Sequence, residues 1–142
     1  DEQAVRDAMA ATNVADLATR EVAELSGGQR QRVWAAMAIA QQTPILLLDE
    51  PTTFLDLTHQ IEMLDLFARL HRSGTTIVAV LHDLNQAARY ATHLIVMKDG
   101  AVVAAGRPAQ VLTEELVHEV FALMEEQGVD TSDMKRIMKE DN

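Results

Sequence analysis

The sequence predicts an α/β fold built around a parallel sheet. Residues 45–48 are an uninterrupted apolar run and residues 75–81 are rich in β-branched side chains, so both are expected to be buried strands, the first on both faces. Residues 57–71, between them, have the apolar periodicity of an amphipathic helix. A helix over about residues 84–91 and a third strand over residues 93–98 continue the alternation, which favours right-handed crossovers.

Composition excludes several classes of protein. The 142 residues suffice for one domain with a hydrophobic core, and the absence of cysteine excludes disulfides and cysteine-ligated metals. A net charge of −10 argues against a nucleic-acid partner, because neutralising phosphates takes a basic surface. No apolar run approaches the roughly 18 residues of a membrane span, and the acidic first residues are unlike a signal peptide. We therefore expect a soluble cytoplasmic protein.

Residues 25–29 contain the start of an informative helix. Ser26 is a favourable N-cap, Gln29 stands at capping-box spacing, and helix-forming residues continue from Gln29 to about residue 41. Gly27 and Gly28 are poor helix formers, each costing about 1 kcal/mol relative to alanine. They leave bare N–H groups at a helix N-terminus, where the helix dipole favours an anion such as phosphate. An ordinary capped helix after a glycine turn is the alternative.

The first predicted strand ends in two adjacent carboxylates, Asp49 and Glu50, followed by Pro51. In open α/β sheets, ligands gather at the carboxyl ends of the strands. We therefore expect Asp49 to face a metal ion and Glu50 to face a group that must lose a proton. The alternative is a solvated pair of acids at a strand exit.

These segments resemble the motifs of ATP-binding cassette (ABC) ATPases. Residues 25–29 resemble the signature motif, and residues 45–50 resemble the Walker B strand with its catalytic glutamate. Residues 53–56 resemble the D-loop, and His82 stands where the family has its switch histidine. The motifs follow in the family's order over roughly residues 15–122, and together they are a specific signal. The resemblance implies part of a P-loop NTPase (ABC ATPase) fold, largely a parallel sheet with flanking helices.

In that family two nucleotide-binding domains form a homodimer that encloses two ATP molecules. The resemblance implies that the signature residues bind the γ-phosphate of an ATP held mainly by the partner domain, and that Asp56 links the two sites across the dimer. The implied cofactor-binding residues are Ser26, Gly27, Gly28, Gln29 and Asp56.

The same resemblance assigns the chemistry of hydrolysis to three further residues. Asp49 would position Mg²⁺ through water, and Glu50 would accept a proton from the attacking water. His82 would contact the γ-phosphate. Such a site works by positioning and charge stabilisation rather than by covalent chemistry.

The sequence departs from the family in one respect: it contains no Gly-x-x-x-x-Gly-Lys-[Ser/Thr] phosphate-binding loop. We expect this Walker A lobe to precede residue 1, with its strand between residues 75–81 and 93–98, so that the chain alone neither binds nor hydrolyses ATP. The predicted organisation is a helical subdomain segment with the signature helix over residues 1–42, the C-terminal part of the core over 43–122 and a tail over 123–142.

Two segments narrow the resemblance to importers. Residues 82–87 and 104–113 resemble ATPases of the iron–siderophore, haem and vitamin B12 group. This implies a subunit on the cytoplasmic face of the membrane that binds transmembrane permease subunits and couples ATP hydrolysis to import. One alternative is a non-transport ABC ATPase head, although residues 1–24 show no coiled-coil heptads before the signature. The other is an interaction module without enzymatic activity.

Several smaller expectations concern local structure. Trp34 and Met37 lie one helical turn apart and are expected to pack inside the subdomain, with contact to a membrane subunit as the alternative. Arg30 and Arg32 could reach a nucleotide or lie on a solvated helix face. The expected apolar face of the first helix is Val5, Ala8, Met9 and Ala11.

The end of the resembling region is expected to contain a hairpin and two short helices. Asp99 and Gly100 predict a tight turn into a strand over residues 101–105. The helices are expected at about residues 109–112 and 114–122. Five histidines are present, and a metal cluster formed from them is not expected.

Overall fold

The computed structural model describes residues 1–113 and residue 116. The chain forms two compact units, Asp1–Tyr90 and Ala91–Asn142. The first unit contains every residue to which the sequence assigns a catalytic, metal or nucleotide role. The predicted helix over 114–122 (apart from residue 116), His118 and the predicted tail over 123–142 lie outside the described residues.

The first unit begins with a helical region. α1 (Glu2–Ala11) is followed by two short 3₁₀ helices, η1 (Ala15–Leu17) and η2 (Val22–Glu24), and then by α2 (Gly27–Ala40). α2 therefore begins directly after Ser26, the predicted N-cap, and contains both glycines in its first turn as the sequence predicts.

A small apolar core holds this helical region together. Its buried members come from α1, the 3₁₀ segments and α2, and they are Ala8, Val14, Leu17, Leu25 and Ala36. The expected face of the first helix is partly wrong, since Val5 is exposed and Ala4 is buried instead. Ala4 and Ala8 share a face because residues four apart in a helix lie one above the other.

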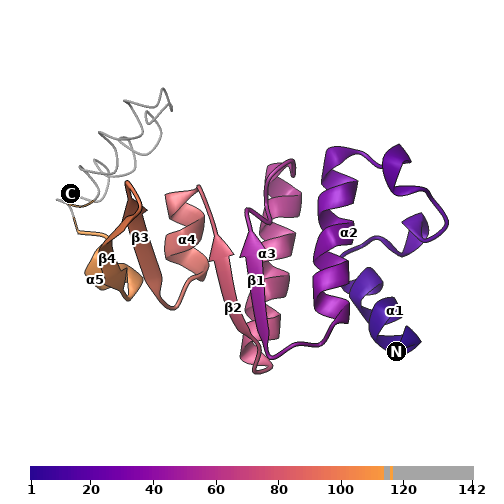
Figure 1. Ribbon diagram of the computed structural model, residues 1–142, viewed down its shortest axis with the longest axis horizontal. Coiled ribbons are helices and arrows are strands. Elements are labelled where there is room, and N and C mark those ends of the chain that lie inside the picture. The colour runs from indigo at the N-terminus through magenta and orange to yellow at the C-terminus, as the bar shows by residue number, and fades with distance from the viewer. Residues whose placement is uncertain (114–115, 117–142) are drawn as a thin grey trace. The chain divides into compact units, whose positions relative to one another are not determined.

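The remainder of the first unit is a β–α–β element followed by a helix. β1 (Ile45–Asp49) and β2 (Thr76–Val80) form a two-stranded parallel sheet, with Leu47 opposite Val78. α3 (Leu57–Arg72) connects the two strands, and α4 (Leu84–Tyr90) follows β2 (Figure 1). The predicted parallel pairing of these two strands is confirmed.

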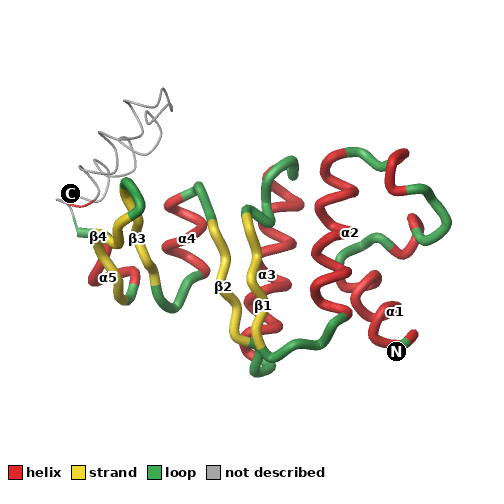
Figure 2. The backbone as a smooth tube through the Cα atoms, viewed as in Figure 1, coloured by secondary structure: helices red, strands yellow, loops and turns green. Residues whose placement is uncertain are grey.

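α3 packs on one face of this sheet, and Figure 2 shows it beside and partly behind β1. The buried residues of this core are Ala35, Leu55, Met63, Leu64, Leu66 and Phe67, with Leu48 and Ile77 of the strands packed against them. The core thus joins α2, α3 and the inner face of the sheet. It fixes the ends of both strands, where the site residues lie.

The expectation that the first strand is buried on both faces is wrong. Leu46 is buried, whereas Leu47 is 76% exposed. Successive side chains of a strand point to opposite faces, and α3 covers only the face that contains Leu46. Ile45 of β1 and Val78 and Val80 of β2 are exposed as well, so the other face of the sheet is an open apolar surface within residues 1–90.

The described part of the second unit is a β-hairpin and a short helix. β3 (Leu94–Lys98) pairs antiparallel with β4 (Ala101–Gly106), and α5 (Pro108–Val111) follows. Asp99 and Gly100 join the strands, and both have positive φ, 50° and 77°. That conformation matches the twist of a two-residue hairpin turn, so the predicted hairpin is confirmed.

The α/β class is confirmed by these elements. β3 is paired with β4, so among the described residues the parallel sheet consists of β1 and β2. Within the described part of the chain, no helix is long and apolar enough to cross a membrane. The boundaries predicted at residues 42 and 122 stay predictions.

Candidate functional site

The N-terminus of α2 has the predicted capping box. The Ser26 hydroxyl accepts a hydrogen bond of 3.2 Å from the Gln29 backbone N–H. The Gln29 side-chain oxygen accepts one of 3.0 Å from the Ser26 backbone N–H. Two N–H groups that would otherwise lack partners at a helix start are thereby satisfied, and the direction in which α2 leaves the preceding segment is fixed.

The two glycines of α2 pack against the turn that follows β1. A Cβ atom on Gly27 would lie 3.3 Å from Phe54 Cβ, and one on Gly28 would lie 3.1 Å from the carbonyl oxygen of Phe54. Larger residues would therefore press on this turn. The close approach of α2 to residues 50–55 therefore explains why glycine stands at both positions. The interpretation from sequence considered only their bare N–H groups.

The carboxylates at the end of β1 occupy different environments. Asp49 is exposed at the last position of the strand. Glu50 begins the turn with φ of 49°, a left-handed conformation that costs a non-glycine residue energy and often occurs at functional sites. Gln31 of α2 donates a hydrogen bond of 3.1 Å to the Glu50 carbonyl oxygen and so supports this conformation.

The Glu50 side chain is held at both carboxylate oxygens. His82 Nε2 lies 2.7 Å from Glu50 Oε1. The Thr53 hydroxyl donates a hydrogen bond of 3.3 Å to Glu50 Oε2. His82 and Glu50 come from the ends of the two parallel strands, and their side chains stay 74% and 42% exposed. A carboxylate fixed in this way and open to solvent can accept a proton from a nearby water.

Asp56 lies farther along the same turn, where it caps α3. Its carboxylate accepts hydrogen bonds from the His59 backbone N–H at 2.9 Å and pairs with His59 Nδ1 at 2.7 Å. These two hydrogen bonds, the backbone one first, lower the pKa of Asp56 below its ordinary value of 3.8. In this chain the Asp56 side chain thus stabilises its own helix.

The structure brings part of the predicted site together. Glu50 contacts His82 directly, and Gly27 and Gly28 touch the turn that begins at Glu50. Asp49 is the residue before Glu50. Among the described residues, no group of three His, Asp or Glu side chains could hold a metal ion. A lone carboxylate still fits Mg²⁺, because that ion is usually bound by one or two carboxylates together with waters and substrate phosphates.

Three residues of this site were not predicted as site residues: Gln31, Thr53 and Phe54. Thr53 and Phe54 were assigned only to the D-loop resemblance, and Gln31 had no assignment. The signal available for Gln31 was its position one helical turn after Gly28, on the same face of α2.

Two of the smaller expectations about α2 are settled by its surroundings. Trp34 is 52% exposed and Met37 is exposed too, so the expectation that they pack inside the subdomain is wrong. Arg30 donates to the Leu25 carbonyl oxygen at 3.1 Å, and Arg32 donates to the Asn13 carbonyl oxygen at 3.2 Å. Both guanidinium groups therefore stabilise the helical region through hydrogen bonds to its backbone.

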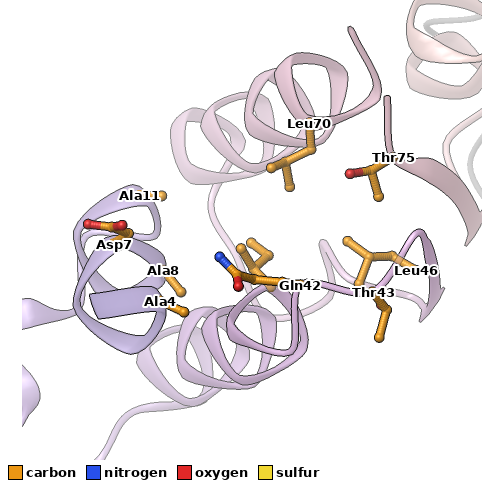
Figure 3. Close-up of a pocket in the computed structure, with 10 residues that line it drawn as sticks. Ala4, Asp7, Ala8, Ala11, Gln42, Thr43, Leu46, Leu70 and Thr75 are labelled. Atoms are coloured by element: carbon orange, nitrogen blue, oxygen red, sulfur yellow. The ribbon is translucent and has the colours of Figure 1, made fainter. Parts of the chain in front are cut away.

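Two of the cavities formed by the described residues lie near these elements. The larger, about 330 Å³, lies between α1, the C-terminal end of α2 and the end of α3, with Asp7, Ala8 and Leu70 among its lining residues (Figure 3). It is lined by none of the predicted site residues. The smaller, about 240 Å³, is lined by Gln31, Trp34, Leu47 and Asp49 among others, and so opens beside the carboxyl end of β1.

Comparison with known proteins gives the relationship of the chain. The family model described as ABC transporter matches residues 1–53. The ferric enterobactin transport ATP-binding protein FepC of Escherichia coli (strain K12) is 55% identical over 124 residues, which are 87% of this chain and 46% of FepC. The chain is a homologue of the ATP-binding proteins of ABC transporters.

Solved structures of ABC proteins resemble the chain in fold. An inward-facing metal-chelate type ABC transporter is 35% identical, with a TM-score of 0.75 over 84% of this chain and 48% of that one. A dimeric ATP-binding cassette in a post-hydrolysis state with ADP and Pi is 32% identical, with a TM-score of 0.70 over 75% of this chain and 46% of that one. The chain spans about half the length of the curated ABC relatives it matches.

Proposed function

We propose that this chain supplies the signature and Walker B part of an ABC ATPase that couples ATP hydrolysis to the import of an iron–siderophore-like substrate. The observation that carries the proposal is the contact between His82 and Glu50, 2.7 Å apart at the ends of adjacent parallel strands. The sequence similarity to FepC, whose name describes ferric enterobactin transport, supports an iron–siderophore-like substrate.

In the proposed reaction Glu50 accepts a proton from the water that attacks the γ-phosphate of ATP. Thr53 and His82 restrict the rotation of the Glu50 carboxylate, so that one oxygen can face the water. His82 is also proposed to contact the γ-phosphate once ATP is bound. Holding reactants and catalytic groups in one geometry is a large part of the barrier reduction in phosphoryl transfer.

The nucleotide and the metal ion are proposed to meet different parts of this surface. Asp49 would hold Mg²⁺ through water, and the ion would supply charge stabilisation at the phosphates. Ser26, Gly27, Gly28 and Gln29 face the γ-phosphate of an ATP bound chiefly to another domain. The N-terminus of α2 suits this role because its dipole attracts an anion.

The proposed partners follow from the same arrangement. A signature surface that binds another domain's ATP requires a second nucleotide-binding domain, and a related cassette has been solved as a dimer with ADP and Pi. Asp56 is proposed to connect the two sites of this dimer. A Walker A lobe completes each site, and transmembrane permease subunits hold the assembly at the cytoplasmic face of the membrane. The net charge of −10 fits a function without nucleic acid.

A second candidate function is an interaction module without catalysis. The observation that favours it is the open apolar face of the β1–β2 sheet, because this chain as it stands presents a surface suited to another polypeptide. A non-transport ABC ATPase head has less support, since α1 and the 3₁₀ helices before the signature are short and do not form a coiled coil.

The proposal is tested first by calorimetry of Mg·ATP binding. The 142-residue chain is measured alone and mixed with a separately expressed Walker A lobe of a related importer. Binding only in the mixture supports a divided ATP site. Tight binding by the chain alone would contradict the assignment of the phosphate site to another lobe.

Turnover then tests the role of Glu50. In the complete protein, Glu50→Gln is expected to lower single-turnover ATP hydrolysis by about 10²–10⁴-fold, the range for general acid–base catalysis. Glu62→Gln, which neutralises an exposed carboxylate on α3, is the matched control and should leave the rate unchanged. Unchanged hydrolysis in Glu50→Gln would refute the assignment.

A further inference from the structure

We propose that Gln60 and Gln86 form a positioning pair that holds His82 against Glu50. The inference rests on the proposed function of Glu50 and His82, and it adds two residues that touch neither substrate nor metal. Gln86 Nε2 donates a hydrogen bond of 2.7 Å to Gln60 Oε1, and this bond joins α4 to α3.

His82 needs such support because it has little of its own. Its side chain is 74% exposed and lies in the bend between β2 and α4. β2 fixes the backbone that enters this bend, and α4 fixes the backbone that leaves it. Any shift of α4 relative to the end of β1 would therefore change the distance between His82 and Glu50.

Gln86 connects α4 to the residue next to His82. Its backbone N–H donates a hydrogen bond of 2.9 Å to Asp83 Oδ1, which makes Asp83 the cap of α4. The Ala87 backbone N–H donates to the Asp83 carbonyl oxygen at 3.0 Å. A displacement of the Gln86 side chain therefore moves the first turn of α4, and with it Asp83 and the adjacent His82.

Gln60 connects the other end of the pair to the turn that contains Glu50. Its Nε2 donates a hydrogen bond of 2.9 Å to the carbonyl oxygen of Leu55, a buried residue. The turn from Glu50 to Leu55 is closed internally, since Thr53 N–H donates to the Glu50 carbonyl oxygen at 3.2 Å. The positions of Glu50 and Gln60 are therefore linked.

The chemistry of the amide explains why glutamine suits both positions. A carbonyl oxygen only accepts, so Leu55 fixes the NH₂ group of Gln60 toward it and turns the Gln60 oxygen toward α4. Gln86 must then donate. A carboxylate or an aliphatic side chain at position 60 could not donate and accept at once, and both glutamines are only half exposed to water that could replace these bonds.

The contacts form a closed ring. Glu50 is linked through its turn to Gln60, Gln60 to Gln86, and Gln86 through Asp83 to His82, which contacts Glu50. Breaking the hydrogen bond between the glutamines interrupts this ring, while every proposed catalytic group stays in the chain. We expect His82 then to sample positions away from Glu50.

The first test uses the 142-residue chain and needs no ATP. The histidine rings are labelled with ¹⁵N for NMR, and the His82 signal is assigned with His82→Asn. Glu50→Gln should shift the His82 ring signal in the wild-type background because the two side chains touch. In a Gln86→Leu background this response should fall to less than half, whereas Gln41→Leu, at an exposed position after α2, should preserve it.

The second test measures ATP turnover in the complete protein. Gln86→Leu should lower kcat by about 10- to 100-fold, since a displacement of about 1 Å can cost about 10²-fold, with KM for ATP nearly unchanged. Gln86→Lys keeps a donor that can reach Gln60 and should restore most of the rate. If Gln86→Leu lowered the rate only by preventing folding, its NMR spectrum would no longer be that of a folded protein.

The outcomes separate this inference from the proposed function. An unchanged response of His82 in Gln86→Leu, or an unchanged kcat, would overturn the positioning pair even where Glu50→Gln abolishes hydrolysis. If Glu50→Gln leaves hydrolysis intact, the proposed function fails, and the NMR response alone then decides whether the glutamines position His82.

Discussion

The hydroxyl of Tyr90 on α4 donates a hydrogen bond of 2.8 Å to Asp65 Oδ1 on α3. This bond is a second connection between the two helices, beside the one made by the glutamines. Burial raises the pKa of Tyr90 above its ordinary value of 10.0, and the Asp65 carboxylate raises it further. Because the pKa is higher in the folded state, the stabilisation is fully present below pH 10.0 and is lost as the pH rises through the folded value.

Asp65→Asn is therefore expected to lower the pKa of Tyr90 toward 10.0, since it removes the negative charge that opposes the phenolate. Tyr90 is the only tyrosine, so an ultraviolet titration of phenolate absorbance follows this residue alone. Arg89→Gln should move the pKa in the opposite direction, because the Arg89 charge lowers it. A Tyr90 titration that is the same in all three proteins would contradict the observed contact.

Asp56→Asn is expected to remove an acid-dependent part of the stability. The folded pKa of Asp56 is lowered below 3.8, so its contribution is present above that value and is lost as the pH falls through the folded pKa. Asparagine is also a good N-cap, so the helix start is retained while the charge is lost. The difference in unfolding free energy between the two proteins should shrink as the pH is lowered.

Urea unfolding at several pH values measures this difference for Asp56. His59→Ala is the companion variant, because it removes the side-chain bond and leaves the backbone bond, which is the larger cause of the lowered pKa. The pKa of Asp56 should then return only part of the way to 3.8. A difference that stays constant across the acid range would exclude the charge as its source.

Ser26→Ala is expected to destabilise the first unit by about 0.5–2 kcal/mol, the usual cost of removing a polar N-cap. The Ser26 hydroxyl satisfies the Gln29 backbone N–H, and alanine leaves that group without this partner. Ser26→Gly is the control, since glycine at an N-cap costs only a few tenths of a kcal/mol. Urea unfolding followed by far-ultraviolet circular dichroism measures the loss of the helices of this unit. Equal stabilities for the alanine and glycine variants would contradict the capping role.

The only tryptophan of the chain, Trp34, tests the open surface beside α2. Its 52% exposure predicts solvent-like emission and strong quenching by iodide in the 142-residue chain. Adding the Walker A lobe of a related importer should shift the emission to shorter wavelength if that lobe covers the surface next to Leu47 and Trp34. Blue-shifted, unquenched emission in the chain alone would show that Trp34 is buried already.

Local features of the fold were predictable because they depend on residues close in sequence. The capping box of Ser26 and Gln29 and the hairpin at Asp99 and Gly100 were both predicted. Each depends on hydrogen bonds or backbone preferences within a few residues. The start of α2 after Ser26 was predicted as well, whereas the close packing of its two glycines against Phe54 was not.

The family relationship could also be predicted from sequence, since it depends on the order and spacing of short motifs rather than on their contacts. The exposure of Leu47 and Trp34 could not. An apolar run has the same sequence whether one or both faces of its strand are covered. Only the position of α3 shows that a single face is covered here, and which one.

The sequence by itself determined which residues stand at the ends of the two parallel strands and that they include a carboxylate and an imidazole. Only the tertiary structure decided that His82 contacts Glu50 and that Gln60 and Gln86 join α3 to α4. The reason is physical: these pairs are separated by 32 and 26 residues, and no local preference acts over such a distance. The packing of α3 on the sheet brings them together, through a core that long-range apolar contacts create.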